Sequence, residues 1–406
     1  MNREVPAANL STRKQLVFAV VIVASLLGLI EGAARIWLAF ASRPAAALDV
    51  ASGAIETKWF DVLNEDLRGG GAGADLYVPD ARLFWRLRPD TSARVVNAVY
   101  KTRTQPVTWN IRINEDGFRG PPYPADEAGA SPVIAALGDS CTFGFRVDED
   151  ETYPAQLQEF LRSQGMGQAV VVNHGVPGYT TFQGDRLLGE ILSRQRPDFV
   201  ILAFGANDLE ADVYSDAAKA KKISPARLRL YGALTHLATA RLFLRGAQWR
   251  RTDPHLSTLT HRVSPDEFRQ NLLAMIRAAR GTGARVILLD LVLIGPVFRE
   301  SIAALAQQEG VVWLDAREIL RSGLDDLLAG RRFREERAQI DRFWRREVEQ
   351  VRLVYYDEAF YRKLSQDPVW RGLLRYLMVE PIHPSPLGQR LIAEAVGRQI
   401  LAQSSP

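Results

Sequence analysis

The tripeptide Gly-Asp-Ser at residues 138–140 places a serine hydroxyl where it can do chemistry. It ends the apolar run 133–138, which has the length and composition of a buried parallel strand. Gly138 permits a sharp turn after the strand, and ligands of open α/β sheets bind just beyond the carboxyl ends of strands. Ser140 is therefore a candidate nucleophile, although many Gly-Asp-Ser tripeptides are simple turns. Its neighbour Cys141 is either a rival nucleophile or a small buried residue under the turn.

Three later segments have a related form, and together they predict a single site. The apolar run 170–173 leads to Gly178, and the apolar run 199–204 leads to Asn207. Near the C-terminus, Glu-Pro-Ile-His ends at His383 and leads into a final helix. Because the carboxyl ends of parallel strands meet at one edge of a sheet, Gly178 and Asn207 can come together with the serine, and the late histidine can reach back to them.

The four segments, in this order, resemble those of the SGNH (GDSL-type) hydrolase family over about residues 132–401, with two long interruptions. The resemblance implies that Ser140 is the catalytic nucleophile and that His383 is its base. It also implies an oxyanion hole made by the backbone N–H of Ser140, together with Gly178 and Asn207.

One position departs from the family's pattern. Where the family has the aspartate of Asp-x-x-His, this chain has Glu380. A glutamate is one methylene longer but can still accept the imidazole N–H, and Ser-His-Glu triads exist on other hydrolase folds. Either Glu380 completes a catalytic triad by orienting His383, or a backbone carbonyl does so and the site is a dyad.

Apolar strands and amphipathic helices alternate along residues 132–404, the expected hydrolase domain. The segment Ser264-Pro-Asp-Glu267 has the form of a capping box at a helix start. Alternation of this kind predicts a parallel sheet with right-handed crossovers. We therefore expect an α/β fold, a three-layer α/β/α, flavodoxin-like sandwich. The expected strands are residues 133–138, 170–173, 199–204, 285–290 and 311–314.

Residues 16–40 are apolar apart from one serine, Glu31 and Arg35, and predict a helix long enough to cross a bilayer. A signal peptide cleaved near residues 45–47 is the alternative, but the apolar run continues past the point where a cleavage region should begin. Glu31 and Arg35 are four residues apart and can pair on one helix face. The basic tail 1–15 places the N-terminus in the cytoplasm and the remaining chain in the periplasm or outside the cell.

The stretch 48–131 carries partly alternating, β-rich patterns and predicts a small β-rich appendage to the main domain. Two of its side chains, Trp109 and Arg119, are candidates for shaping a substrate groove. Simple packing of the appendage on the main domain is the alternative.

Two insertions, residues 210–262 and 321–378, interrupt the main domain. Within the first, residues 219–251 carry nine lysines and arginines and no acidic residue. Such a segment can lie on anionic lipid, or its helices can cover the sheet edge with the cations in water. Nucleic acid is not an expected partner for a domain outside the cell. The second insertion directly precedes the histidine segment, and it either caps the site or simply packs there.

The composition limits the chemistry further. With 406 residues, 47% of them hydrophobic and 24% charged, the chain can form one large globular domain with an appendage. Its single cysteine excludes an intramolecular disulfide. The histidines do not have zinc-ligand spacing and there is no Gly-rich phosphate loop, so we expect neither a metal nor another cofactor.

The expected function is cleavage of an ester, such as an O-acetyl or O-acyl group on an envelope glycan or lipid, through an acyl-serine intermediate. An O-acyltransferase would use the same residues, with a sugar hydroxyl in place of water, so it stays an alternative. A non-catalytic envelope scaffold is the third alternative, and Glu380 is the only residue that favours it.

Overall fold

The computed structural model describes residues 11–41, 76–97, 107–122, 131–212, 214–226, 237–240, 242, 260–291, 298–347, 364, 366–379 and 381–404. The chain divides into two compact units. One unit comprises residues 1–46 and 225–253, and the other comprises residues 47–224 and 254–406. The domain and insertion boundaries expected from the sequence stay predictions.

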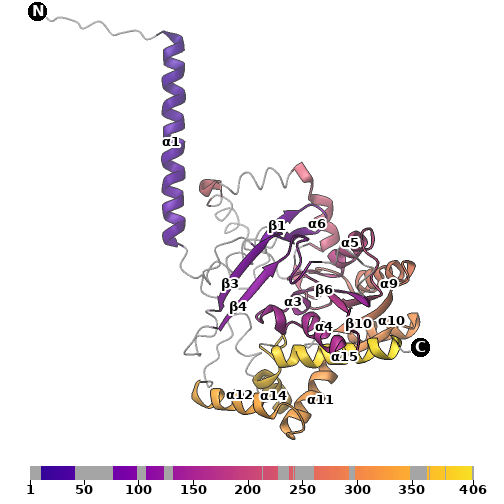
Figure 1. The fold of residues 1–406 in the computed structure, drawn as a ribbon. Helices are drawn as coiled ribbons and strands as arrows, with labels where there is room; N and C mark the ends of the chain where they lie inside the picture. Colours follow the sequence, from indigo (N-terminus) through magenta and orange to yellow (C-terminus); the bar gives the residue numbers. More distant parts are fainter. Residues whose placement is uncertain are drawn as a thin grey trace, which may run out of the picture. The chain divides into compact units, whose positions relative to one another are not determined.

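A parallel five-stranded sheet forms the centre of the larger unit (Figure 1). The strands lie in the order β11-β10-β7-β5-β6, and every neighbouring pair is parallel. The first strand, β5, is thus an inner strand, and the strand order reverses beside it, which creates the crevice where ligands of such sheets bind. The five strands confirm the sequence prediction: β5 (Val133–Gly138), β6 (Val170–Gly175), β7 (Phe199–Ala203), β10 (Arg285–Asp290) and β11 (Val312–Asp315).

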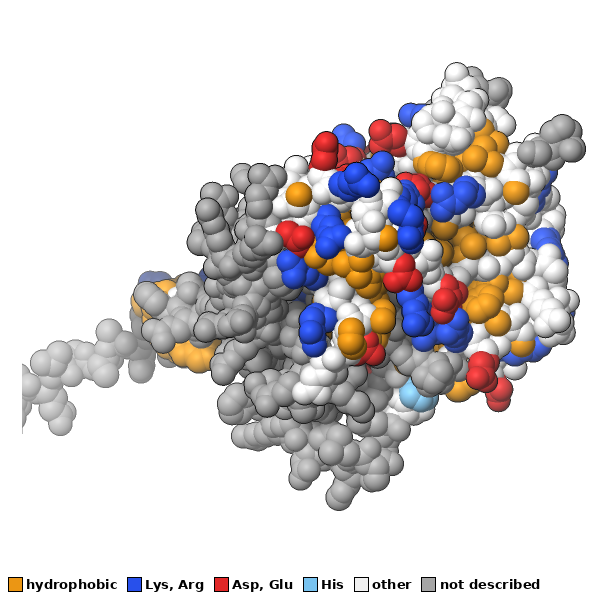
Figure 2. Space-filling model, turned by 90° about the horizontal axis from the view of Figure 1, so that it is seen from below, with side chains coloured by type: hydrophobic (Ala, Val, Ile, Leu, Met, Phe, Trp, Pro, Cys, Tyr) orange, Lys and Arg blue, Asp and Glu red, His pale blue; other side chains and the backbone are white. Residues whose placement is uncertain are grey.

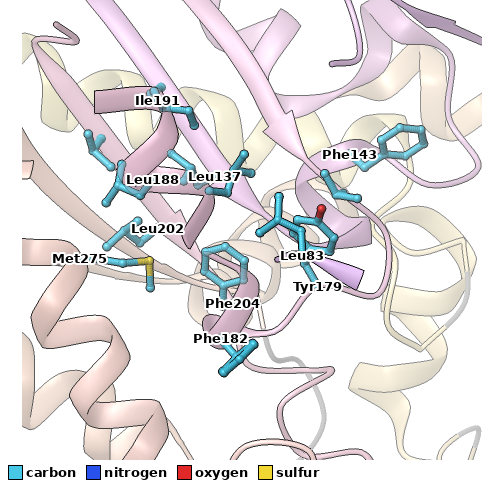
Figure 3. Close-up of a cluster of buried hydrophobic side chains, with 14 of the residues drawn as sticks. Leu83, Leu137, Phe143, Tyr179, Phe182, Leu188, Ile191, Leu202, Phe204 and Met275 are labelled. Atoms are coloured by element: carbon cyan, nitrogen blue, oxygen red, sulfur yellow. The ribbon is translucent and has the colours of Figure 1, made fainter. Parts of the chain in front are cut away.

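Helices cover both faces of this sheet, which confirms the expected α/β/α layers. Side chains alternate along β5: Ala135 and Leu137 face one apolar cluster, and Ile134 and Ala136 face the other. Figure 3 shows part of the first cluster, in which Leu137 and Leu202 from the sheet lie near Leu188 and Met275 from helices. The helices of the first face are α5 (Thr181–Leu192), α9 (Pro265–Gly281) and α10 (Arg299–Glu309), and those of the second are α4 (Tyr153–Ser163), α11 (Ala316–Leu328) and α15 (Pro386–Ser404).

Helix α9 begins at the capping box that the sequence predicts. The backbone N–H of Glu267 donates to Ser264 Oγ at 3.3 Å, and Ser264 N–H donates back to Glu267 Oε2 at 3.1 Å. Pro265 occupies the first turn, where its missing N–H leaves no bond unmade.

Two antiparallel strand pairs precede the sheet, in the stretch where the sequence predicts a β-rich appendage. Strand β1 (Tyr77–Asp80) pairs with β2 (Phe84–Leu87), and β3 (Thr91–Asn97) pairs with β4 (Val107–Ile113). After β4 the chain turns, and Arg119 makes an isolated antiparallel bridge to Asn173 of β6. The appendage is therefore joined to the edge strand of the main sheet.

On the face seen in Figure 2, basic, acidic and apolar side chains are intermixed. The remaining elements are α3 (Ser140–Phe143), η2 (Glu149–Glu151), β8 (Ala211–Asp212), α6 (Asp216–Lys222), β9 (Thr260–His261), α12 (Arg334–Glu347) and α14 (Pro368–Tyr376). Arg375 of α14 pairs with Asp341 of α12 at 2.5 Å, and Arg332, just before α12, pairs with Glu394 of α15 at 2.7 Å.

The smaller unit contains the apolar helix α1 (Thr12–Ala41). Its segment Thr12–Trp37 has a mean hydropathy of 2.5 and is long enough to cross a membrane, which fits an anchor or a signal sequence. Glu31 accepts a bond from Arg35 Nε at 2.9 Å, the predicted pair. The same carboxylate accepts the backbone N–H groups of Ala238 at 2.8 Å and Thr239 at 3.1 Å. Its hydrogen-bond donors thus come from within this unit.

Candidate active site

Ser140 lies at the carboxyl end of β5, beside the point where the strand order reverses. Asp139 caps the short helix α3 by accepting the N–H of Cys141 on Oδ1 at 2.9 Å, so the serine becomes the first residue of the helix. The helix packs so closely on the strand ends that a Cβ on Gly138 would overlap Thr142 and a Cβ on Gly175 would overlap the backbone of Phe143. The glycines thus permit the position of the serine.

His383 reaches this serine from the opposite end of the sequence. Its Nε2 lies 2.8 Å from Ser140 Oγ, which is hydrogen-bond distance across 243 residues of chain. The histidine loop is closed by two backbone bonds, from Val379 N–H to His383 O at 2.9 Å and from Ser385 N–H to Leu377 O at 2.8 Å. Helix α15 begins directly after it, so the histidine is held by a short closed loop at the start of a helix that packs on the sheet.

Two further bonds join the serine helix to the histidine segment. Cys141 is 1% exposed, and its Sγ donates to Ile382 O at 3.5 Å. Gln389, at the start of α15, donates from Nε2 to Cys141 O at 3.4 Å and accepts Tyr153 N–H on Oε1 at 2.9 Å. Cys141 is therefore a small buried residue under the turn, the second of the two roles that the sequence allows. Gln389 is a site residue that the sequence did not reveal.

Asn207 joins the loops that follow three neighbouring strands. Its Nδ2 donates to Asp139 Oδ2 at 3.2 Å and to Tyr179 O at 3.1 Å. Tyr179 follows Gly178, whose φ of +82° is a left-handed conformation that glycine adopts without strain. The structure thus brings the Gly178 and Asn207 loops to the residue next to the nucleophile, as expected from the sequence.

The loop of Gly178 is supported by a buried arginine that the sequence analysis missed. Arg262 is 1% exposed, and it donates to Gly178 O at 2.9 Å, to Asp216 Oδ2 at 3.0 Å and to Glu210 Oε2 at 3.0 Å. Burial opposes the charge of Asp216, but Arg262 and Lys219 hold the pKa of Asp216 below its ordinary value. Lys219, counted among the basic residues of the first insertion, is therefore inside the protein.

Two buried carboxyl groups beside the site have raised pKa values. Burial raises the pKa of Asp139 to about 6, against the opposing effects of the Cys141 N–H and of the nearby His383. Burial likewise raises the pKa of Asp208 to about 7, although the hydroxyl of Thr181 donates to it at 2.5 Å. Both groups titrate near neutral pH because little water reaches them.

Aromatic side chains pack against the histidine. The ring of Phe145 lies 5.0 Å from the imidazole of His383, tilted by 40°, and Trp109 of β4 meets Phe145 edge-on at 5.2 Å. Trp109 is 2% exposed and Arg119 is 1% exposed, so neither side chain lines an open groove. Both belong instead to the packing behind the site.

Glu380 lies outside the described residues, so the choice between triad and dyad stays a prediction. Within the second insertion, residues 348–363 and 365 also lie outside them, and the cap hypothesis stays a prediction. Within the described part of the chain, no three His, Cys, Asp or Glu side chains gather as a metal site would require. A cavity of about 190 Å³ among α10, α11 and α14, lined by Arg317 and Trp370, does not include the serine–histidine pair.

Comparison with known proteins places the sequence that forms this site in a family. Residues 136–391 match the model of the GDSL-like lipase/acylhydrolase family, which is more than half of the chain. The chain is 33% identical over 79 residues to an arylesterase of Vibrio mimicus, which is 20% of this chain and 39% of that protein. It is 32% identical over 81 residues to thioesterase 1/protease 1/lysophospholipase L1 of Escherichia coli K12, which is 20% of this chain and 37% of that protein.

The chain thus spans about two fifths of the length of these curated relatives. Among solved structures, the esterase AlinE4 is 26% identical, with 46% of this chain and 76% of that chain covered and a TM-score of 0.31. A G-D-S-L family lipolytic protein of Desulfitobacterium hafniense DCB-2 is 19% identical, with 66% and 99% covered and a TM-score of 0.35. On the extent of the family match, the chain belongs to the GDSL-like lipase/acylhydrolase family.

Proposed function

We propose that this chain is a serine esterase that cleaves acyl esters through an acyl-serine intermediate. The observation that carries the proposal is the 2.8 Å distance between Ser140 Oγ and His383 Nε2. The pair lies beside the point where the strand order of the parallel sheet reverses. Family membership supports the same reaction class, because the family is one of lipases and acylhydrolases.

In the proposed reaction, His383 Nε2 takes the proton of the Ser140 hydroxyl as its oxygen attacks the ester carbonyl. The oxyanion is stabilised by the N–H groups of Ser140 and Gly178 and by the amide of Asn207, one of whose two donations passes to the substrate. The protonated histidine then gives its proton to the leaving alcohol. Water, deprotonated by the same histidine, then attacks the acyl carbon. The bond to Ser140 Oγ breaks, the histidine returns the proton to that oxygen, and the acid is released.

We place the catalytic unit in the periplasm or outside the cell, tethered by α1, with an O-acyl group on an envelope glycan or lipid as substrate. The apolar helix supports a membrane or export route, and the positive tail supports its orientation. The remaining basic residues of segment 219–251 are proposed as a second contact with anionic lipid.

The test is acetate release from p-nitrophenyl acetate by the full chain in detergent, beside its Ser140→Ala variant. We expect release by the wild type and none above background by the variant, with matching labelling by a fluorophosphonate probe. A folded wild type that neither releases acetate nor takes the label would contradict esterase function. If a sugar acceptor raises p-nitrophenol release, and acetylated sugar forms in place of acetate, the result would favour the acyltransferase alternative.

A further inference from the structure

A buried arginine in the segment before the family-matched region contacts the loop that follows the serine helix. Arg119 is 1% exposed, and it donates to the carbonyls of Phe143 at 2.8 Å, Gly144 at 2.5 Å and Val147 at 2.7 Å. A fourth donation reaches Asn110 O of β4 at 2.9 Å. The guanidinium therefore joins the appendage to residues 143–147, immediately after the serine helix.

The local sequence explains how the arginine reaches this position. Asn114 closes a turn by accepting Phe118 N–H on Oδ1 at 3.0 Å and donating from Nδ2 to Pro121 O at 2.9 Å. Gly117 takes a φ of +81° in this turn, a conformation that favours glycine. Phe118 then packs edge-on against buried His174 at 4.3 Å, and Arg119 bridges to Asn173 of β6. Both backbone and side-chain contacts fix the arginine before it meets the loop.

The loop that Arg119 holds contacts both members of the catalytic pair. At one end, Phe143 and Gly144 supply the last carbonyls of helix α3, whose first residue is Ser140. In its middle, Phe145 packs on His383 at 5.0 Å. Movement of this loop would therefore displace the serine and the imidazole together.

We propose that Arg119 is a positioning residue, which holds the 143–147 loop so that Ser140 Oγ and His383 Nε2 stay within hydrogen-bond distance. The proposal rests on the proposed esterase function. Burial lowers the pKa of Arg119 to about 10. Because this pKa is still well above neutral pH, the side chain stays charged and its bonds to carbonyls are charge-assisted. A lysine has one ammonium with three donors and no planar fork, so it cannot reach the same four acceptors.

The experiment compares full-length wild type with Arg119→Lys in detergent, by kinetics and by hydrogen exchange with mass spectrometry. A displacement of about 1 Å at a catalytic group lowers a rate by as much as about 100-fold. We therefore expect kcat for p-nitrophenyl acetate to fall about 10- to 100-fold with KM changed less than about 3-fold. Peptides covering 140–147 and 381–385 should exchange faster, while those of β7 and β10 should not.

Two further variants separate positioning from general loss of stability. Arg332→Lys replaces an arginine paired with Glu394 on α15, and it should leave kcat and exchange at 140–147 unchanged. Phe145→Leu keeps an apolar side chain in a half-buried position but removes the ring from His383, and it should lower kcat without lowering labelling stoichiometry. This variant tests the same loop contact if Arg119→Lys does not fold.

The outcomes decide between the two proposals. Wild-type kcat with unchanged exchange at 140–147 in Arg119→Lys would overturn the positioning role while leaving the esterase proposal intact. A folded wild type that neither releases acetate nor takes the fluorophosphonate label would overturn the esterase proposal. In that case the exchange comparison still decides whether Arg119 orders the loop.

Discussion

At the scale of single residues, Asn207 holds the loops after three strands together through the two hydrogens of one amide. Asn207→Ala removes a proposed oxyanion donor, a change that lowers kcat about 10²- to 10³-fold in a well-studied hydrolase. We expect a loss of that size with a folded protein, measured as kcat for p-nitrophenyl acetate beside the melting temperature. Near-normal turnover would exclude Asn207 from the oxyanion hole.

Cys141 gives a second prediction at this scale. Its sulfur is buried and donates to Ile382 O, which is the position of a packing residue and does not suit a nucleophile. Cys141→Ala should therefore keep kcat within about 3-fold, with a modest loss of stability from the missing contact. Ser140→Ala should not retain thiol-dependent activity, and inactivation of that variant by a thiol reagent would show that the cysteine is a nucleophile after all.

The sequence identifies some residues of the candidate site and cannot identify others, for a physical reason. Four site residues follow strands or belong to short motifs, so their positions at one sheet edge can be predicted: Ser140, Gly178, Asn207 and His383. Gln389 acts on a backbone carbonyl 248 residues away. Every residue has a carbonyl, so the partner of such a side chain leaves no mark in the sequence; Arg119 and Arg262 were missed in these roles for the same reason.

At the scale of elements, Asp208 connects the loop after β7 to the start of α5 by accepting Thr181 N–H at 2.9 Å. Burial raises its pKa to about 7 from 3.8, so the folded chain binds this proton more tightly than the unfolded chain. The stabilisation that the proton brings is complete below about pH 4 and is lost as the pH rises through about 7.

Asp208→Asn should remove this dependence, because the amide is neutral at every pH and its Oδ1 can still accept both bonds from Thr181. The melting temperature of the variant relative to wild type should therefore rise between about pH 5 and pH 8. Thermal unfolding followed by circular dichroism measures it. A difference that stays constant across this range would contradict the assignment.

The elements themselves were largely readable from the sequence. Five buried strands with helices between them can form only a few sheet topologies, and the predicted layers are confirmed. The appendage was harder to predict, since β1 and β2 have only four residues each and their pairing follows from contacts with the main domain. Trp85 of β2, for example, donates from its indole to Pro177 O at 3.1 Å.

At the scale of the whole molecule, α1 has the length and hydropathy of a membrane anchor or a signal sequence. Its 26-residue span of mean hydropathy 2.5 should keep the full chain in the membrane fraction after an alkaline carbonate wash. The intact mass should include residues 1–47, and a mature N-terminus after residue 47 would show that the helix is a cleaved signal. An accessible cysteine placed near the N-terminus would test the orientation through labelling of intact cells.

The bonds of Arg119 also affect how this region can vary between related proteins. Because its acceptors in the loop are the backbone carbonyls of residues 143, 144 and 147, substitutions at 143 and 147 still leave a carbonyl acceptor. A side chain at Gly144 would instead overlap Thr152 and crowd Arg119. The constraint falls on the arginine, on Gly144 and on the turn 114–117 that presents the arginine. Pairwise covariation would therefore miss this link, whereas loss of the arginine should accompany loss of the whole appendage.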